Sequence, residues 1–189
     1  MSELENMLNG EWYKATDKEL LKLRDKAREL IFKYNNLPTN DYKAHNKLLK
    51  KLFKKCDSKA FIEAPLRCDY GFNVSVGKNF YANYNLVLLD SGKITIGDNV
   101  MIAPNVSFYT VDHPIHPSDR STYLEQSKPI TIENNVWIGG NVVILKGVTI
   151  GENSVIGAGS VVTKNIPKNS LAFGNPCKVV RKITSKDRL

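Results

Sequence analysis

Two of the three histidines of the chain, His113 and His116, lie in a polar segment that contains prolines. A neutral imidazole in a partly buried loop can accept a proton near physiological pH, which is the chemistry of a general base. A carboxylate or a carbonyl oxygen on the other ring nitrogen would fix the tautomer, and Asp112 and Glu125 are the available carboxylates. The spacing does not rank the two histidines. His45 lies in a predicted helix and is expected to be structural.

Basic side chains gather near the C-terminus, around a Phe-Gly-Asn-Pro turn at residues 173–176. They are Lys164, Lys168, Lys178, Arg181 and Lys182. Lys178 and Arg181 are three residues apart, so they can share a face and contact phosphate. The cluster therefore favours a small polyanionic cofactor, and residues 183–189 are expected to form a frayed tail.

Aromatic and amide side chains alternate between residues 70 and 85. This mixture suits carbohydrate, because a ring covers the apolar C–H side of a sugar while amides bind its hydroxyls. Asn83 is a candidate sugar ligand, although a corner residue of a repeat explains it equally well. Asn79 and Asn99 are expected to be corner residues only.

The elements that must position these groups follow a six-residue beat. An aliphatic residue recurs at Ile132, Ile138, Ile144, Ile150, Ile156 and Val162. Neither a helix nor a half-buried strand has this period, whereas a stacked β-solenoid does. The aliphatic residue points inward, and Gly, Asn and Asp take the corners. Because one coil cannot bury its own core, stacking supplies the stability.

The same beat occurs upstream in two registers, from Ala64 to Leu88 and from Ile96 to Phe108. Residues 90–93 separate the registers and are predicted to loop out at a corner. Between Phe108 and Ile132 the beat lapses for a multiple of six residues, so the solenoid can resume in phase. A long loop on a regular repeat is usually functional, and this loop carries both candidate histidines.

The first sixty residues are predicted to form a helical arm. Capping boxes at Ser2-x-x-Glu5 and Thr16-x-x-Glu19 open two helices, and a third spans about residues 41–53. The apolar stripes of these helices are expected to cover the first coils, which would otherwise be exposed. The resulting division is a helical segment at 1–60, a β-helix at 61–170 with a loop at 109–131, and a C-terminal tail at 171–189.

Composition limits the function classes. The 189 residues carry a formal charge of +8, but no helix-turn-helix, zinc-finger or RNP pattern accompanies it, so nucleic acid is not the expected partner. The three cysteines form no C-x-x-C pair, which argues against a disulfide framework and a zinc site. The absence of a long apolar run and of a signal-peptide pattern leads us to expect a cytoplasmic protein without membrane partners.

These features together resemble the hexapeptide-repeat acyltransferases, and among them the maltose and galactoside O-acetyltransferases. The resemblance covers nearly the whole chain. It rests on an ordered set of motifs at residues 7–20, 80–83, 94–106, 113–114, 135–139 and 174–176. The His-Pro pair in the loop excursion makes the set specific.

The resemblance implies a left-handed parallel β-helix that forms a homotrimer, with each active site between two subunits. It implies that acetyl-CoA donates an acetyl group to a hydroxyl of a maltose-, glucose- or galactoside-like sugar. His113, the histidine of the His-Pro motif, would remove the hydroxyl proton, and the N–H of Gly140 would stabilise the carbonyl oxygen. No metal is implied, because a thioester is already activated.

The resemblance also implies the binding residues. The acceptor-binding set is Asp69, Asn83, Ser91 and Glu125. The coenzyme A-binding set is Gly140, Ala158, Thr163, Lys164, Lys178 and Arg181. Two alternatives remain open. The same chemistry could act on serine, an amino sugar or a xenobiotic, or the solenoid could be a non-catalytic scaffold.

Overall fold

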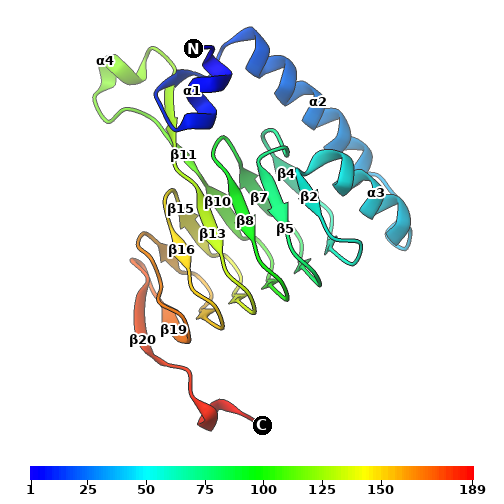
Figure 1. The fold of residues 1–189 in the computed structure, drawn as a ribbon, viewed down its shortest axis with the longest axis vertical. Helices are drawn as coiled ribbons and strands as arrows, with labels where there is room; N and C mark the ends of the chain where they lie inside the picture. Colours follow the sequence, from blue (N-terminus) through cyan, green and yellow to red (C-terminus); the bar gives the residue numbers. More distant parts are fainter.

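The computed structural model describes residues 1–189, and its main body is a parallel β-solenoid shaped as a three-sided prism. Each coil contributes one short strand to each of three sheets, because the six-residue beat brings the chain to a corner after every side. The helices lie at one end of the prism, and the last strands and the C-terminus lie at the other (Figure 1). The predicted fold class, mainly β with an N-terminal helical arm, is confirmed.

We name each face of the prism after one of its strands. The β10 face consists of β4 (Leu66–Cys68), β7 (Leu86–Leu89), β10 (Ser107–Tyr109), β15 (Val143–Leu145) and β18 (Val161–Val162). The β13 face consists of β2 (Lys55–Cys56), β5 (Val74–Val76), β8 (Ile94–Ile96), β13 (Ile130–Ile132) and β16 (Thr149–Ile150). The β14 face consists of β3 (Phe61–Ile62), β6 (Tyr81–Ala82), β9 (Met101–Ile102), β14 (Trp137–Ile138), β17 (Val155–Ile156), β19 (Ser170–Phe173) and β20 (Lys178–Lys182).

Stacked aliphatic residues fill the interior of the prism, as the beat predicts. Ile144 is in register with Phe108 of the coil before it and with Val162 of the coil after it, and all three side chains are fully buried. The same core of 34 buried residues continues into the helical arm. Each Å² of apolar surface buried in this way stabilises the fold by about 25 cal/mol, so the stacked side chains hold successive coils together.

Asparagines occupy one column of corners in the left-handed backbone region, where their φ values lie between 54° and 58°. The side-chain amides form a ladder along this column. Its members are Asn79, Asn99, Asn135, Asn153 and Asn169, joined by hydrogen bonds of 2.9 to 3.1 Å. Asn79 and Asn99 are thus corner residues, as predicted.

The helical arm consists of α1 (Glu3–Asn9), α2 (Lys18–Asn35) and α3 (Tyr42–Leu52). The predicted capping box of Ser2 and Glu5 is present. The second helix begins differently, because Asp17 rather than Thr16 caps it by accepting from Glu19 and Leu20. This difference follows from the carboxylate of Asp17 reaching two free N–H groups.

The arm covers the first coils of the prism. Ile31 and Tyr34 of α2 and Leu49 of α3 are buried in the solenoid core. His45 is 2% exposed, and its ring packs edge-on against Tyr34, so the prediction of a structural histidine is confirmed. The first strand of the coils begins at Lys55, which lies inside the expected helical range 1–60. The division of the chain at residues 60 and 170 stays a prediction. No helix in the chain combines the length and apolar character needed to cross a bilayer.

The loop at 109–131 contains its own structure. It holds β11 (Val111–Asp112), the short helix α4 (Pro117–Arg120) and β12 (Leu124–Ser127). A strand of the N-terminal segment, β1 (Tyr13–Lys14), pairs antiparallel with β12, which pairs with β11 on its other edge. The loop and the N-terminal segment therefore form one three-stranded sheet beside α1 (Figure 1).

Candidate functional site

His113 follows β11 directly, so the small sheet of the loop sets its position. Its Nδ1 lies 3.0 Å from the carbonyl oxygen of Leu124 in β12. Because a carbonyl oxygen only accepts, Nδ1 must carry the proton, and Nε2 is left with its lone pair. The side chain is 49% exposed, so Nε2 is accessible to a substrate. This arrangement fixes one tautomer and leaves a ring nitrogen that can accept a proton.

His116 is placed differently. It caps α4 at the outer end of the loop, is exposed, and directs Nδ1 to the hydroxyl of Ser118 at 2.6 Å. No carboxylate lies within ion-pair distance of its ring. The structure thus separates the two histidines that spacing alone left unranked.

The two loop carboxylates also separate. Asp112 forms an ion pair of 2.5 Å with Lys146 of the next coil, so it anchors the base of the loop. Glu125 places Oε1 3.8 Å from Nε2 of His113 and is only 14% exposed. The tautomer is therefore fixed by a backbone carbonyl, and the neighbouring charge comes from Glu125.

Sequence reasoning missed Tyr13. This tyrosine is fully buried, and its hydroxyl donates to Oε2 of Glu125 at 2.5 Å. Burial raises the pKa of Tyr13 well above its ordinary value, and the charge of Glu125 raises it further. A lone tyrosine before a predicted helix gives no signal in sequence, because its partner lies 112 residues away.

Asp69 and Ser91 lie at the corner that follows β4 and β7, on the same edge of the β10 face as the root of the loop. Burial raises the pKa of Asp69, and the charge of Arg24 opposes this shift. The hydroxyl of Ser91 is buried and has no hydrogen-bond partner. The carboxylate of Asp69 is thus available to hydroxyls of a ligand, whereas Ser91 is only 1% exposed.

Asp90, beside Ser91, is a second residue that sequence reasoning missed. Its Oδ1 accepts from the N–H groups of Asp69 and Tyr70 at 3.1 and 2.9 Å, whereas Oδ2 is buried without a partner. Burial raises the pKa of Asp90 to about 6, and the nearby charge of Asp69 contributes to the shift. The corner that holds Asp69 is therefore tied to a buried carboxyl.

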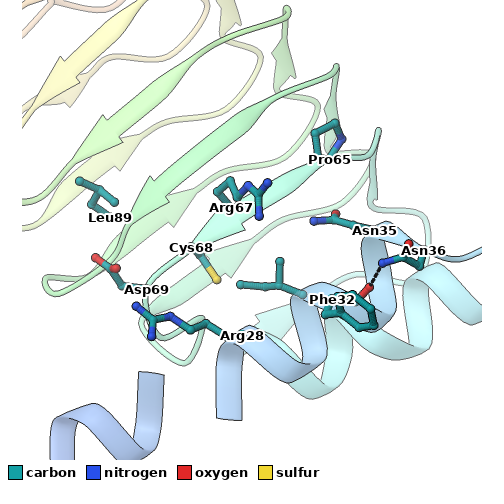
Figure 2. A pocket seen from close by; sticks show the side chains of 10 residues that line it. Arg28, Phe32, Asn35, Asn36, Pro65, Arg67, Cys68, Asp69 and Leu89 are labelled. Carbon is teal, nitrogen blue, oxygen red and sulfur yellow. Dashed lines mark hydrogen bonds between the residues drawn. The ribbon is translucent and has the colours of Figure 1, made fainter. Parts of the chain in front are cut away.

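Arg24 of α2 is a third missed residue. Its Nη2 donates to the hydroxyl of Tyr70 at 2.8 Å, and its Nε is buried without a partner. A groove of about 680 Å³ runs from the corner that follows β4 and lies between α2 and the β10 face (Figure 2). Arg28, Phe32 and Arg67 line the groove, and Asp69 stands at its end.

Asn83, Gly140 and Ala158 lie at a different corner, where β6, β14 and β17 end. The carboxamide oxygen of Asn83 accepts from the N–H of Tyr84 at 2.8 Å, as expected of a corner residue. The N–H groups of Gly140 and Ala158 donate no hydrogen bond within the chain. These two free N–H groups, one coil apart, can donate hydrogen bonds to oxygen atoms of a ligand.

The predicted basic residues are all exposed. Thr163 and Lys164 follow β18, and Lys178 and Arg181 lie on β20. Residues three apart in a regular strand face opposite sides, but a bulge at Val180 adds one residue to β20. As a result, Lys178 pairs with Phe173 and Arg181 pairs with Leu171, and these two partners lie on the same side of β19. Lys178 and Arg181 therefore share the outer face, as predicted.

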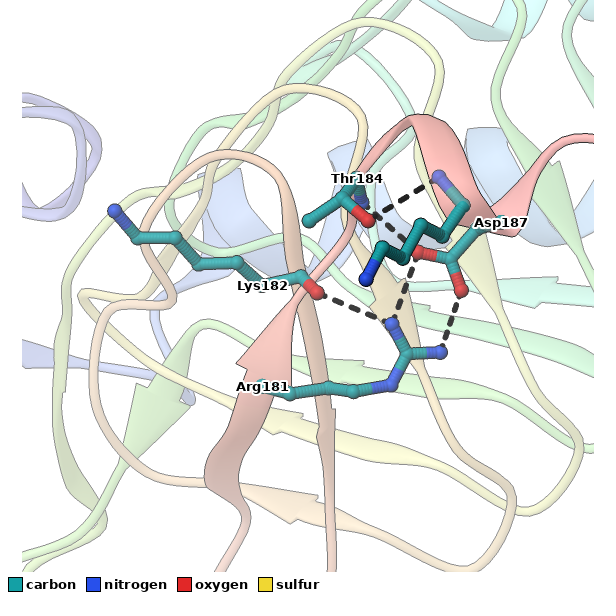
Figure 3. A network of polar contacts seen from close by, with 5 residues as sticks. Arg181, Lys182, Thr184 and Asp187 are labelled. Atoms are coloured by element: carbon teal, nitrogen blue, oxygen red, sulfur yellow. Dashed lines mark hydrogen bonds and ion pairs between the residues drawn. The ribbon is translucent and has the colours of Figure 1, made fainter.

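The C-terminal residues are ordered by Arg181, contrary to the expected frayed tail. Both terminal nitrogens of Arg181 donate to the carboxylate of Asp187, at 2.7 and 2.9 Å (Figure 3). Thr184 caps the turn η1 (Ser185–Asp187) that presents this carboxylate. The charged pair lowers the pKa of Asp187 to about 2, so the carboxylate stays ionised across the working pH range.

Two family models match the chain. The maltose acetyltransferase hexapeptide capping motif matches residues 6–57, and the bacterial transferase hexapeptide of six repeats matches residues 129–164. The chain is 47% identical to the galactoside O-acetyltransferase of Escherichia coli strain K12 over 87% of this chain and 81% of that protein.

Two solved structures superpose on nearly the whole chain. A maltose O-acetyltransferase from Clostridium difficile 630 has a TM-score of 0.96 at 49% identity, covering 98% of this chain and 99% of that one. A galactoside acetyltransferase in complex with coenzyme A has a TM-score of 0.95 at 43% identity, covering 99% of this chain and 94% of that one. The shared architecture extends from the helical arm to the last coil.

Proposed function

The chain belongs to the maltose and galactoside O-acetyltransferase group of the hexapeptide-repeat acyltransferases, and we propose that it transfers an acetyl group from acetyl-CoA to a hydroxyl of a sugar. One observation carries the proposal. The Nδ1–H of His113 is bound to the carbonyl of Leu124, which leaves Nε2 as an accessible proton acceptor. That the chain is an acyltransferase follows from its family.

His113 acts as the general base. Its Nε2 takes the proton of the acceptor hydroxyl while the oxygen of that hydroxyl bonds to the carbonyl carbon of the acetyl group. The imidazolium formed in this step lies 3.8 Å from the carboxylate of Glu125, so its charge is stabilised. When the tetrahedral centre collapses, the C–S bond breaks and the proton on Nε2 passes to the departing thiolate.

The oxygen that becomes negative in this step needs a hydrogen-bond donor. The N–H of Gly140 has no acceptor within the chain, so it can donate to this oxygen without breaking another hydrogen bond. Acetyl-CoA supplies an activated acyl group and a good leaving group. The side chains of Lys164 and Lys178 are exposed cations that suit its phosphates, and Arg181 would exchange the carboxylate of Asp187 for a phosphate.

We further propose a homotrimer with active sites between copies. His113 and Gly140 belong to opposite edges of the β10 face, because His113 follows the end of β10 whereas Gly140 precedes the start of β15. One side of the prism is about six residues, or about 20 Å, wide. Within one copy, His113 and the N–H of Gly140 are therefore too far apart to act on one substrate. The facing edge of a second copy can bring its Gly140 close to His113.

An apolar stripe on the β14 face supports association. The stripe contains Tyr81, Met101 and Trp137, which are in register and are 37%, 55% and 50% exposed. Exposed apolar patches of this kind mark interaction surfaces. The stripe adjoins the corner that holds Gly140 and Asn83, so an interface there would bound the site.

The acceptor would bind at Asp69, Ser91 and Asn83. The partly buried carboxylate of Asp69 can bind sugar hydroxyls from the His113 corner, whereas the hydroxyl of Ser91 is buried and would have to become exposed to do so. Asn83 would contribute from the Gly140 corner of the neighbouring copy. The polar side chains of this site favour a polyhydroxylated acceptor over an apolar one.

The experiment is a thiol-release assay with a panel of acceptors at fixed acetyl-CoA. We expect maltose, glucose and a galactoside to give the highest kcat/KM, above serine, glucosamine and chloramphenicol. Thiol release without acceptor provides the background. A preference for an amine or for serine would contradict the sugar acceptor, and the absence of heat on titration with coenzyme A would favour a scaffold.

A further inference from the structure

We propose that Tyr13 is a positioning residue of the reaction, and that its phenol holds the carboxylate of Glu125 against the Nε2 edge of His113. The inference rests on the proposed function, because it assigns His113 as the base. It adds a residue of the N-terminal segment to a site whose other members come from the prism and its loop.

The backbone places the two side chains together. In the pairing of β1 with β12, Tyr13 lies directly opposite Glu125, and Lys14 lies opposite Leu124. Residues directly opposite each other in an antiparallel pair project to the same side of the sheet. The phenol of Tyr13 therefore meets the carboxylate of Glu125, and the 2.5 Å hydrogen bond joins them.

The two carboxylate oxygens of Glu125 have separate tasks. Oε2 accepts from Tyr13, while Oε1 is the oxygen that lies 3.8 Å from Nε2 of His113. A glutamate has three side-chain torsions, so it needs a fixed partner to keep one orientation. With Oε2 held, Oε1 stays on the side of the imidazole, where it stabilises the imidazolium formed during transfer.

The surroundings of Glu125 keep this contact intact. Burial and the charge of Glu125 both raise the pKa of Tyr13, so the phenol stays a donor. Arg24 from α2 and Asp69 and Tyr70 from the corner after β4 also face Glu125. Arg24 already donates to Tyr70, so Tyr13 is the residue whose donated hydrogen bond fixes Glu125.

The strand β1 also supports the second contact of the base. Leu124, whose carbonyl oxygen holds Nδ1 of His113, is the β12 residue opposite Lys14. The N–H of Ala15 extends the pairing by donating to the carbonyl of Tyr123 at 3.2 Å. The N-terminal segment thus fixes both neighbours of the imidazole, the carbonyl through its backbone and the carboxylate through Tyr13.

The test compares Tyr13→Phe with Tyr34→Phe in the full chain. Tyr34 is the matched control, because it is equally buried and its hydroxyl donates to the carbonyl of Ile62, away from the loop. We expect Tyr13→Phe to lower kcat roughly 10-fold, the order expected for one hydrogen bond to a charged group, with an unchanged KM for acetyl-CoA. The acid limb of its pH profile should move, whereas Tyr34→Phe should leave the rate and the profile unchanged.

A double-mutant cycle shows whether Tyr13 acts through Glu125. In a Glu125→Ala background we expect Tyr13→Phe to have no further effect, because the group that it positions is gone. Equal losses for Tyr13→Phe in both backgrounds would overturn the proposal, as would equal rates for Tyr13→Phe and Tyr34→Phe.

A crystal structure of Tyr13→Phe gives a readout that does not depend on activity. We expect the carboxylate of Glu125 to leave its position beside His113 or to occupy more than one orientation. A carboxylate that keeps its wild-type place would overturn the inference whatever acceptor the enzyme uses. Failure of the proposed function would instead appear in the wild-type protein, as a lack of acetyl transfer to sugars.

Discussion

The imidazole of His113 differs from that of His116 in the acceptor that holds its Nδ1. The first is bound to a backbone carbonyl of β12, and the second to a serine hydroxyl at the end of the loop. A carbonyl can only accept, whereas a hydroxyl can accept or donate, so only the first contact fixes one tautomer. One tautomer and an accessible Nε2 are what the proposed role of His113 as a general base requires.

Asp90 makes the stability of the chain depend on pH. Its pKa is about 6 in the folded chain because of burial, above the ordinary value of 3.8 in an unfolded chain. The folded state therefore keeps a proton that the unfolded state has released, so this group makes folding less favourable as pH rises from 4 to 6. The accumulated penalty is about 3 kcal/mol, from 1.36 kcal/mol for each pKa unit.

We expect Asp90→Asn to remove this dependence. The amide oxygen of asparagine can still accept from Asp69 and Tyr70, and the side chain does not titrate. Relative to wild type, the variant should gain stability between pH 4 and pH 7, as measured by thermal unfolding at both values. If the two proteins differ by the same amount at both pH values, Asp90 is not the titrating group.

At the scale of the element, the corners of the coils depend on asparagine for two reasons. Asn135 has a φ of 58°, and its amide accepts from Asn99 at 3.1 Å and donates to Asn153 at 3.0 Å. The backbone conformation costs an ordinary residue about 1–2 kcal/mol, whereas glycine adopts it freely. The amide hydrogen bonds of the ladder and the left-handed backbone conformation therefore contribute separately to the stability of the corner.

Two substitutions at Asn135 separate these contributions. Asn135→Gly should lose only the ladder bonds, and Asn135→Ala should lose them and also strain the backbone. We expect the alanine variant to be less stable than the glycine variant by about 1–2 kcal/mol, measured by chemical unfolding. Equal losses would mean that backbone strain does not select asparagine at this corner.

The elements show how far sequence reasoning reaches. The hexapeptide beat predicted the coils because each inward position is a local repeat, and the Ser2 cap was visible for the same reason. The contact between Tyr13 and Glu125 was not visible, because strand pairing over 112 residues has no local signal. The bulge at Val180 likewise leaves no mark in sequence, although it decides which side Arg181 faces.

At the scale of the whole molecule, the choice of His113 came from the resemblance of the His-Pro motif and not from spacing. The structure adds a physical reason for the choice, since Glu125 and Leu124 both meet that ring. It also divides the candidate residues between two corners of one prism. The proposed trimer, which the resemblance already implied, would bring the two corners together across neighbouring copies.

The most direct test of His113 as the base is the rate of thiol release by His113→Ala, with His116→Ala as the matched control from the same loop. We expect His113→Ala to lower kcat roughly 10² to 10⁴-fold with an unchanged melting temperature, because it removes the proton acceptor but no core contact. His116→Ala should keep the wild-type rate. A His113→Ala enzyme that works at the wild-type rate, or a comparable loss in His116→Ala, would contradict this account.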